Sequence, residues 1–177
     1  MRNVYDESDV RRTIATLADH ISGAFRADLP LNIVGILTRG EVLASRLAAA
    51  LAQRGFGKIG RGILDITLYR DDLTEIGPSP LVRPTEIHVD INQQPLLLVD
   101  DVLFTGRSIR AALDALSDFG RPKVIRLAVL VDRGGRELPI AADFVGLTLP
   151  DVPADHRVNV HMDETDGRDE IVVEPRS

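Results

Sequence analysis

The stretch at residues 96–116 constrains this chain most, because it joins an apolar run to two carboxylates, a glycine turn and a helical pattern. The apolar run at 96–99 is typical of a central parallel strand that is covered on both faces. Asp100 and Asp101 follow directly, at the strand end where ligands bind in open α/β sheets. These carboxylates need hydrogen-bond donors, and the vicinal hydroxyls of a ribose would supply them without a metal.

The turn after these acids has the composition of an anion-binding loop. Gly106 permits close approach of the backbone, and an apolar pattern with helical spacing follows at 109–116. The turn is therefore also a helix N-terminus, whose amides and positive dipole end favour a phosphate. Thr105, Arg107 and Ser108 would be further donors. The stretch thus predicts a cradle for a ribose 5-phosphate, with a plain strand exit and helix cap as the alternative.

The composition is that of one compact domain. The 177 residues are 44% hydrophobic, which suits a substantial core, and the absence of cysteine excludes a disulfide framework or a thiolate metal site. The first nine residues lack the apolar core of a signal peptide, and no apolar run approaches the ~20 residues of a membrane helix. We therefore expect a cytoplasmic protein without a membrane partner. The net charge of −6 disfavours broad attraction to nucleic acid, although a local basic face could still bind RNA.

Strand-like and helix-like patterns alternate along the rest of the chain, which predicts an α/β fold with a central, mostly parallel sheet flanked by helices. We expect helices at 8–25, with Ser8 as the cap, and at 41–53, and strands at 32–37, 63–69, 85–91, 124–131 and 143–149. Residues 157–162 and 170–173 predict a terminal hairpin that would form a small hood over a ligand. The single domain, 1–177, would thus have a core at about 8–150 and a hood at about 151–177.

A second junction of strand, turn and helix lies at Thr38, Arg39 and Gly40. Its amides can bind an anion at a helix N-terminus, and Arg39 adds a charged fork. On its own this turn is also compatible with an ordinary loop that carries a surface arginine. Beside the predicted cradle, it is the second candidate site.

Residues 96–108 resemble the phosphoribosyl pyrophosphate (PRPP) motif of the type I phosphoribosyltransferases, in which an apolar strand precedes two acids, two apolar residues and x-Thr-Gly-x-Ser/Thr. The resemblance implies that fold, in which the acid pair holds the ribose hydroxyls and the turn holds the 5-phosphate. The residues it assigns to PRPP are Asp100, Asp101, Val102, Leu103, Phe104, Thr105, Gly106, Arg107 and Ser108. It also implies that the loop at 38–40 takes the pyrophosphate group. With the acid pair, Arg39 would then be a catalytic residue.

The segment at about 70–84 predicts a flexible loop, because Gly77 and three prolines prevent a regular element. Type I enzymes close such a loop over the reacting carbon, which would exclude water from PRPP. Arg70 and Arg83 are the residues in it best suited to meet the charge of pyrophosphate. A surface hairpin without a role is the alternative.

Three blocks of sequence in order, at 64–73, the PRPP motif and 127–140, together resemble the PyrR family of bacterial pyrimidine-operon attenuators that also have uracil phosphoribosyltransferase activity. The resemblance implies that uracil and PRPP give UMP and pyrophosphate, with Mg²⁺ as the PRPP complex. It also implies that a homodimer or higher homo-oligomer binds a pyr mRNA stem-loop when UMP is bound. The four histidines are scattered without ligand spacing, so no resident metal site is predicted.

The family's layout places the base against Val131, Asp132 and Arg133, although Asp132 and Arg133 could equally form an ion pair at the strand end. Phe104 bears on the base independently. Hypoxanthine-guanine enzymes usually have an acidic residue there, which can exchange a proton with the purine ring, and phenylalanine cannot. The residue thus disfavours those enzymes without excluding adenine or orotate relatives.

The candidate RNA-binding residues, Arg11 and Arg12, stand on a surface that departs from the family. Relatives usually carry further basic residues on the first helix, His or Arg at two later positions and a Lys-Asn pair near the end of the core. This chain has, at those places, Ala15, Thr16 and Asp19, then Gly135 and Ala141, and then Leu147 and Thr148. Fewer cations make fewer phosphate contacts, so we expect an intact catalytic cradle and weak or absent attenuation. A phosphoribosyltransferase without RNA regulation and a non-catalytic, nucleotide-sensing RNA-binding protein are the alternatives.

Overall fold

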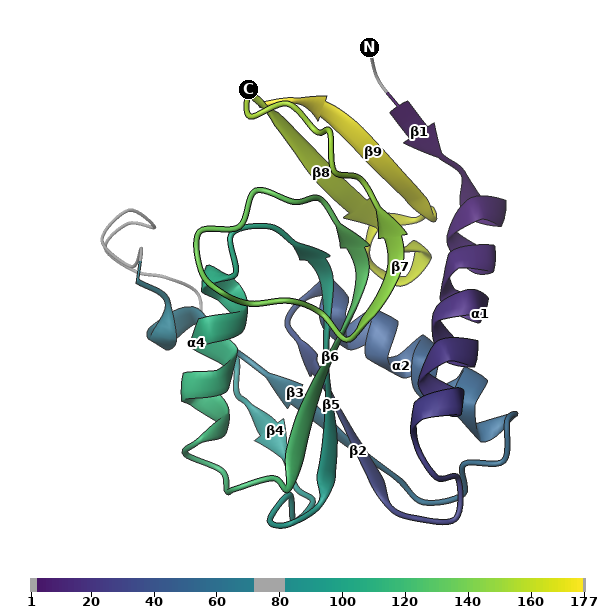
Figure 1. Cartoon of the computed structure of the whole chain (residues 1–177), viewed down its shortest axis with the longest axis vertical. Coiled ribbons are helices and arrows are strands. Elements are labelled where there is room, and N and C mark those ends of the chain that lie inside the picture. The colour runs from purple at the N-terminus through teal and green to yellow at the C-terminus, as the bar shows by residue number, and fades with distance from the viewer. Residues whose placement is uncertain (1–2, 72–81, 177) are drawn as a thin grey trace.

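The larger sheet of the molecule is mostly parallel, as the sequence predicts (Figure 1). The computed structural model describes residues 3–71 and 82–176. In these ranges six strands lie in the order β4-β3-β2-β5-β6-β7, and only β4 is antiparallel to its neighbour. Their bounds are β2 Leu31–Ile36, β3 Ile59–Leu64, β4 Glu86–Ile87, β5 Pro95–Leu103, β6 Val124–Asp132 and β7 Phe144–Thr148.

Helices cover both faces of this sheet, which explains the continuous apolar run in β5. Helices α1 (Glu7–Ala24) and α2 (Arg39–Ala52) pack on one face, and α4 (Arg107–Leu116) packs on the other (Figure 1). Leu97 and Val99 point into the core under α1 and α2, whereas Leu96 and Leu98 point into the core under α4. The middle of β5 therefore lies between two buried apolar layers.

A second, antiparallel sheet of three strands lies beyond the carboxyl ends of the central strands (Figure 1). It consists of β1 (Asn3–Tyr5), β9 (Glu170–Pro175) and β8 (His156–His161), in that order. A short helix, α5 (Asp163–Asp166), connects β8 to β9. The predicted terminal hairpin is confirmed as β8 and β9, whereas β1 was not predicted.

The starts of two helices, α1 and α2, differ from the sequence interpretation. Asp6, and not Ser8, caps α1, because the Asp6 carboxylate accepts the Asp9 amide and the Asp9 carboxylate accepts the Asp6 amide. Helix α2 begins at Arg39 and not at residue 41. Arg39 therefore lies in the first helical turn.

The predicted strands at 63–69 and 85–91 were wrong in extent. Strand β3 begins at Ile59 and ends at Leu64, and Thr67–Tyr69 form a single 3₁₀ turn, η1. The Asp65 carboxylate accepts both the amide and the hydroxyl of Thr67, and this local bond turns the chain away from the sheet. Of residues 85–91, only the two in β4 pair with the sheet.

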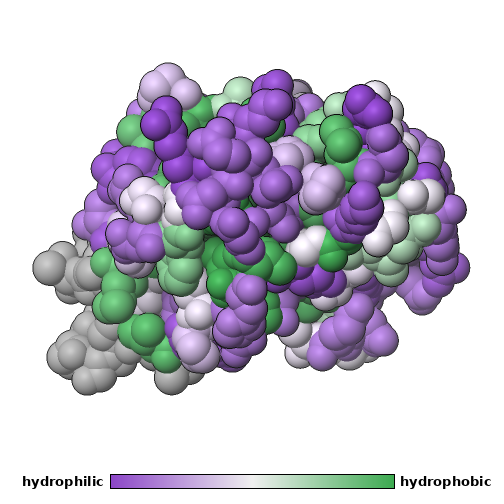
Figure 2. Space-filling model, turned by 90° about the horizontal axis from the view of Figure 1, so that it is seen from below, coloured by the Kyte–Doolittle hydropathy of each residue, from purple (hydrophilic) through white to green (hydrophobic). Residues whose placement is uncertain are grey.

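The end of the molecule opposite the three-stranded sheet is mainly hydrophilic, with apolar side chains gathered in smaller patches (Figure 2). Across the described ranges, no helix is long and apolar enough to cross a bilayer.

Candidate active site

The acid pair lies at the carboxyl end of β5, where the sequence places it. Asp100 is 8% exposed, and its carboxylate accepts the Asp101 amide at 2.9 Å. The Asp101 carboxylate accepts the Val102 amide at 2.9 Å. Burial and the neighbouring Asp101 charge raise the pKa of Asp100 well above its usual range. A buried carboxyl of this kind is stabilised by donors from a ligand, such as the hydroxyls of a sugar.

The turn after β5 passes through the buried Gly106 into the first turn of α4, where Arg107 and Ser108 are exposed. Gly106 has a φ of +93°, a conformation that glycine adopts without strain, and it contributes no capping side chain to α4. The Thr105 hydroxyl oxygen accepts the Arg107 amide at 3.2 Å. The first amides of a helix have no carbonyl partner within the helix, so those of α4 form a candidate anion site, in which the Arg107 amide already has the Thr105 hydroxyl as its acceptor.

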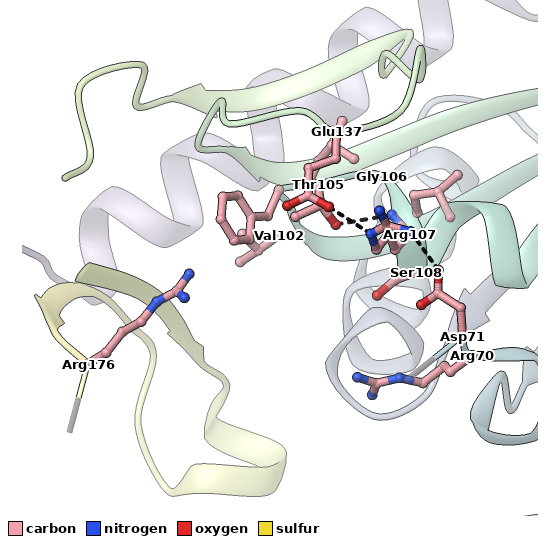
Figure 3. A pocket seen from close by; sticks show the side chains of 12 residues that line it. Arg70, Asp71, Val102, Thr105, Gly106, Arg107, Ser108, Glu137 and Arg176 are labelled. Atoms are coloured by element: carbon pink, nitrogen blue, oxygen red, sulfur yellow. Dashed lines mark hydrogen bonds and ion pairs between the residues drawn. The ribbon is translucent and has the colours of Figure 1, made fainter. Parts of the chain in front are cut away.

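Arg107 is held by two carboxylates (Figure 3). Its Nε donates to Glu137 at 2.7 Å and its Nη1 donates to Asp71 at 2.7 Å. Asp71 also accepts from Arg110 at 2.9 Å. A phosphate in this turn would therefore share the Arg107 guanidinium with two anionic side chains.

A cavity of about 820 Å³ opens over this turn. Arg70 reaches it from the segment after η1, and Arg176 reaches it from the end of β9 (Figure 3). The other lining residues are Asp71, Val102, Leu103, Phe104, Thr105, Gly106, Arg107, Ser108, Ile109 and Glu137. Sequence reasoning missed Asp71, Glu137 and Arg176, because nothing in their local sequence indicates proximity to the turn.

The second candidate turn packs directly against the acid pair. A Cβ on Gly40 would lie 2.6 Å from the Val99 carbonyl oxygen and 3.4 Å from an Asp100 carboxylate oxygen. Only glycine permits this approach. Thr38 is exposed and provides no side-chain cap. The structure thus brings the two predicted anion turns together at one edge of the sheet, as parallel strands require.

Arg39 does not line the cavity; instead it forms an ion pair with Asp166 at the end of α5. Its Nη2 and Nε lie 2.9 Å and 3.2 Å from the two carboxylate oxygens of Asp166. This contact spans 127 residues of sequence, which is why the motif alone does not reveal it.

The predicted base residues lie beside the PRPP motif, since Val102 and Leu103 pair in register with Val131 and Asp132. The alternative ion pair between Asp132 and Arg133 is wrong, because Asp132 pairs with Arg136 at 2.6 Å. Arg133 is 5% exposed and donates to the His156 carbonyl at 2.8 Å.

Two arginines from different parts of the chain lie near the ring of Phe104. The guanidinium carbon of Arg133 lies 3.9 Å from the ring centroid, and that of Arg176 lies 5.3 Å from it. A Cβ on Gly135 would lie 2.5 Å from the ring. Phe104 thus packs at the loop, where cation–π contacts fix its position.

Most of the predicted loop at about 70–84 lies outside the described residues, since 72–81, with Gly77, Pro78 and Pro80, are not among them. Arg83 is exposed, and its amide donates to the Asp65 carboxylate at 2.5 Å. Asp65 therefore joins the two ends of the loop.

Two further sequence expectations concern metals and RNA. No group of three or more His, Cys, Asp or Glu side chains in the described part of the chain could hold a metal ion. Arg11 and Arg12 are exposed on α1, where they pair with Glu7 and Asp9.

Comparison with known proteins gives the class to which this fold and site belong. The family model of the phosphoribosyl transferase domain matches residues 2–163. A hypoxanthine-guanine phosphoribosyltransferase from Bacillus anthracis has a TM-score of 0.71 at 16% identity, with 98% of each chain covered. A hypoxanthine phosphoribosyl transferase from Trypanosoma cruzi has a TM-score of 0.71 at 21% identity, covering 97% of this chain and 89% of its own. These structures show the type I phosphoribosyltransferase fold.

Curated relatives are much more similar in sequence. The chain is 49% identical to the bifunctional protein PyrR of Chloroflexus aurantiacus, over 97% of this chain and 94% of the relative. It is 52% identical to that of Thermus aquaticus, over 92% of this chain and 90% of the relative. The chain therefore belongs to the phosphoribosyl transferase family and, within it, to the PyrR proteins.

Proposed function

We propose that this protein transfers the phosphoribosyl group of PRPP to uracil, giving UMP and pyrophosphate. The observation that carries the proposal is the end of β5, where the acid pair stands directly before a turn whose amides open a helix. The PyrR relatives, at about half identity over nearly the whole chain, support the same reaction class.

In the proposed reaction, the bond between ribose C1 and the pyrophosphate oxygen breaks, and its electron pair leaves with pyrophosphate. N1 of uracil supplies the pair for the new bond, and its proton passes to the departing pyrophosphate. The ribose is oxocarbenium-like during the exchange, so positioning and neutralisation of the leaving group supply most of the rate enhancement. Mg²⁺ enters as part of the PRPP substrate, held chiefly by substrate oxygens and water.

The side chains divide this work among themselves. Asp100 and Asp101 orient the ribose through its hydroxyls, and the turn at 105–108 holds the 5-phosphate on its amides. Arg39 and the turn at 38–40 take the pyrophosphate group, with Arg70 and Arg83 as further cations from the loop ends.

The base would lie at the end of β6, near Val131, Asp132 and Arg133. The side chains of Asp132 and Arg133 already have protein partners, so this part of the proposal depends on main-chain contacts. Donors and acceptors of the main chain suit the amide-like edge of uracil.

A screen of uracil, orotate, hypoxanthine, guanine and adenine with PRPP tests the reaction. We expect pyrophosphate release that requires both uracil and PRPP, with the purines and orotate far slower. Turnover with a purine at the rate of uracil would overturn the base assignment, and UMP binding without any turnover would identify a sensor.

The relatives' name, bifunctional, supports a second function, which we infer to be UMP-dependent binding of a pyr mRNA stem-loop. We expect it to be weak or absent here, because few cations stand on the first helix and Arg11 and Arg12 already have acidic partners. A gel-shift titration of pyr leader RNA with and without UMP tests this. Tight binding that UMP enhances would contradict the expectation.

We further propose a cytoplasmic homodimer or higher homo-oligomer, as the family resemblance implies. Light scattering of the purified protein tests the assembly, and a monomer at all concentrations would contradict it.

A further inference from the structure

The contact between Arg39 and Asp166 joins the pyrophosphate turn to the three-stranded sheet. Arg39 is the first residue of α2, and Asp166 is the last residue of α5. The side chain of Asp166 is 17% exposed and that of Arg39 is 37% exposed, so the contact is partly shielded from water. A pair with this shielding and two parallel hydrogen bonds has more defined geometry than a surface ion pair.

The Asp166 carboxylate is also held by hydrogen bonds from its own segment, in addition to those from Arg39. One of its carboxylate oxygens accepts the Met162 amide at 2.9 Å and the Thr165 hydroxyl at 2.8 Å. These bonds, with that from Arg39 as the largest cause, lower the pKa of Asp166. The carboxylate is therefore ionised at neutral pH and stands in one orientation.

The whole α5 segment is anchored on α2 a second time, independently of Arg39. Arg46, further along α2, donates to Glu164 at 2.9 Å and 2.5 Å, and to Asp169 with two bonds of 2.7 Å. The loss of the Asp166 contact alone should therefore leave α5 in place.

The pairing also determines which side of the Arg39 guanidinium remains available. Asp166 uses the edge formed by Nε and Nη2. A guanidinium has five N–H donors in a planar fork, so the edge formed by Nη1 and Nη2 still presents two parallel donors. No other acceptor for Arg39 is found in the parts of the chain that the structure describes. This second edge can bind two oxygens of one phosphoryl group.

We propose that Asp166 is a positioning residue, which orients Arg39 so that the free edge of its guanidinium meets the pyrophosphate group of PRPP. The inference rests on the proposed function, because it gives Arg39 that ligand. Asp166 would not touch the substrate, and its effect would pass through Arg39 alone.

The variant Asp166→Asn keeps the shape of the side chain and removes its charge. We expect the KM for PRPP and the inhibition constant of pyrophosphate to rise about 10-fold, because Arg39 then samples several orientations. The dissociation constant of UMP, which has no pyrophosphate group, should stay within about 2-fold of the wild type. The matched control is Glu164→Gln, which removes one partner of Arg46 on the same segment and should change neither constant.

A second series separates positioning from a merely structural role. In an Arg39→Ala background, Asp166→Asn should cause no further loss of pyrophosphate affinity, because the residue through which it acts is gone. A further 10-fold loss there would overturn the inference, as would an equal weakening of UMP and pyrophosphate in the single variant. Tighter pyrophosphate binding in Asp166→Asn would show that Asp166 blocks Arg39, and would also overturn it.

The wild-type measurements keep the two proposals apart. Wild-type protein that binds neither UMP nor pyrophosphate would overturn the proposed function and this inference together. Wild-type protein that binds both, with Asp166→Asn unchanged, would overturn the inference alone.

Discussion

The two predicted anion turns of this protein share one plan and differ in what the glycine and the arginine of each turn do. Both follow a buried parallel strand and open a helix, and both contain a glycine and an arginine. Gly106 is buried and adopts a positive φ, which turns the main chain from β5 into the first turn of α4. Gly40 instead permits close packing, since any Cβ there would collide with the Val99 carbonyl. One glycine presents amides, and the other brings a helix against the acid pair.

The arginines of the two turns, Arg107 and Arg39, differ in how exposed their acidic partners are. Arg107 pairs with Asp71 and Glu137, whose side chains are 31% and 53% exposed, whereas Arg39 pairs with Asp166, which is 17% exposed and has two further donors. The main-chain donors of the turn at 105–108 come from a local stretch, whereas its Arg107 is held by residues 36 and 30 positions away. In the turn at 38–40, which we propose to take pyrophosphate, Arg39 is held by a residue 127 positions away. A local motif can present a phosphate site through its backbone, but a side chain needs distant support to stay in place.

Substitution of the acid pair, Asp100 and Asp101, should have the largest effect on turnover, because both turns lie beside it. We expect Asp100→Asn to lower the turnover rate by on the order of 10²-fold, because a charged hydrogen bond to the ribose is worth about 1.5–3 kcal/mol. The double variant Asp100→Asn/Asp101→Asn should lose on the order of 10³-fold or more. Steady-state release of pyrophosphate measures both, and unchanged kinetics would reject the site.

The single variant Asp100→Asn should also be more stable toward unfolding than the wild type at neutral pH. Because the pKa of Asp100 is raised in the fold, the folded state binds its proton more tightly than the unfolded chain does. The stability that this group contributes is present at low pH and is lost as pH rises through the folded pKa. Urea unfolding at pH 7.5 should show a gain of about 1 kcal/mol for Asp100→Asn, which vanishes below about pH 4. A less stable variant at pH 7.5 would contradict the assigned cause.

A pair of glycine substitutions separates the two turns. We expect Gly106→Ala to weaken UMP binding about 10-fold and to leave pyrophosphate binding unchanged, since strain at a positive φ distorts only the amide turn. Gly40→Ala should weaken both, because its Cβ displaces Arg39 and the acid pair together, at a cost of about 1–3 kcal/mol. Calorimetric titration measures each constant. Equal loss of both ligands in Gly106→Ala would show that the turns are not separate subsites.

The smallest effect concerns the carboxylates around Arg107. Glu137→Gln removes a charge that holds Arg107 and repels a phosphate in the same cavity. We expect UMP to bind about 2–3-fold tighter, and the gain to shrink as salt is added. The matched control is Asp114→Asn, at an exposed position of α4, the helix that begins at Arg107. It should leave the affinity for UMP unchanged. Weaker UMP binding in Glu137→Gln would show that this contact helps the site.

The sequence predicts those parts of the molecule whose causes are local. The apolar run of β5, the acid pair and the glycine turn identify the central strand and the helix start after it, because burial on both faces and helix-start chemistry are visible in about twenty residues. The turn at 38–40 was also found, since it repeats that pattern. The prediction of Ser8 as the cap of α1 was wrong because Asp6, two residues earlier, is also a residue type that caps helices.

What the sequence does not reveal depends on contacts far apart in the chain. Asp166, Arg176 and Asp71 have no motif of their own, and only the fold brings them to the two turns. Asp132 forms its ion pair with Arg136, four residues further along the chain, and not with the neighbouring Arg133. Strand β1 has only three residues and pairs at an edge of its sheet, so it is too short for an alternation of apolar and polar residues that would predict it.

The crystal structure of the complex with UMP tests the central claim most directly. We expect the 5-phosphate within hydrogen-bond distance of the amides of Gly106, Arg107 and Ser108, with the ribose hydroxyls on Asp100 and Asp101. A nucleotide bound elsewhere, with this turn left to solvent, would contradict the account.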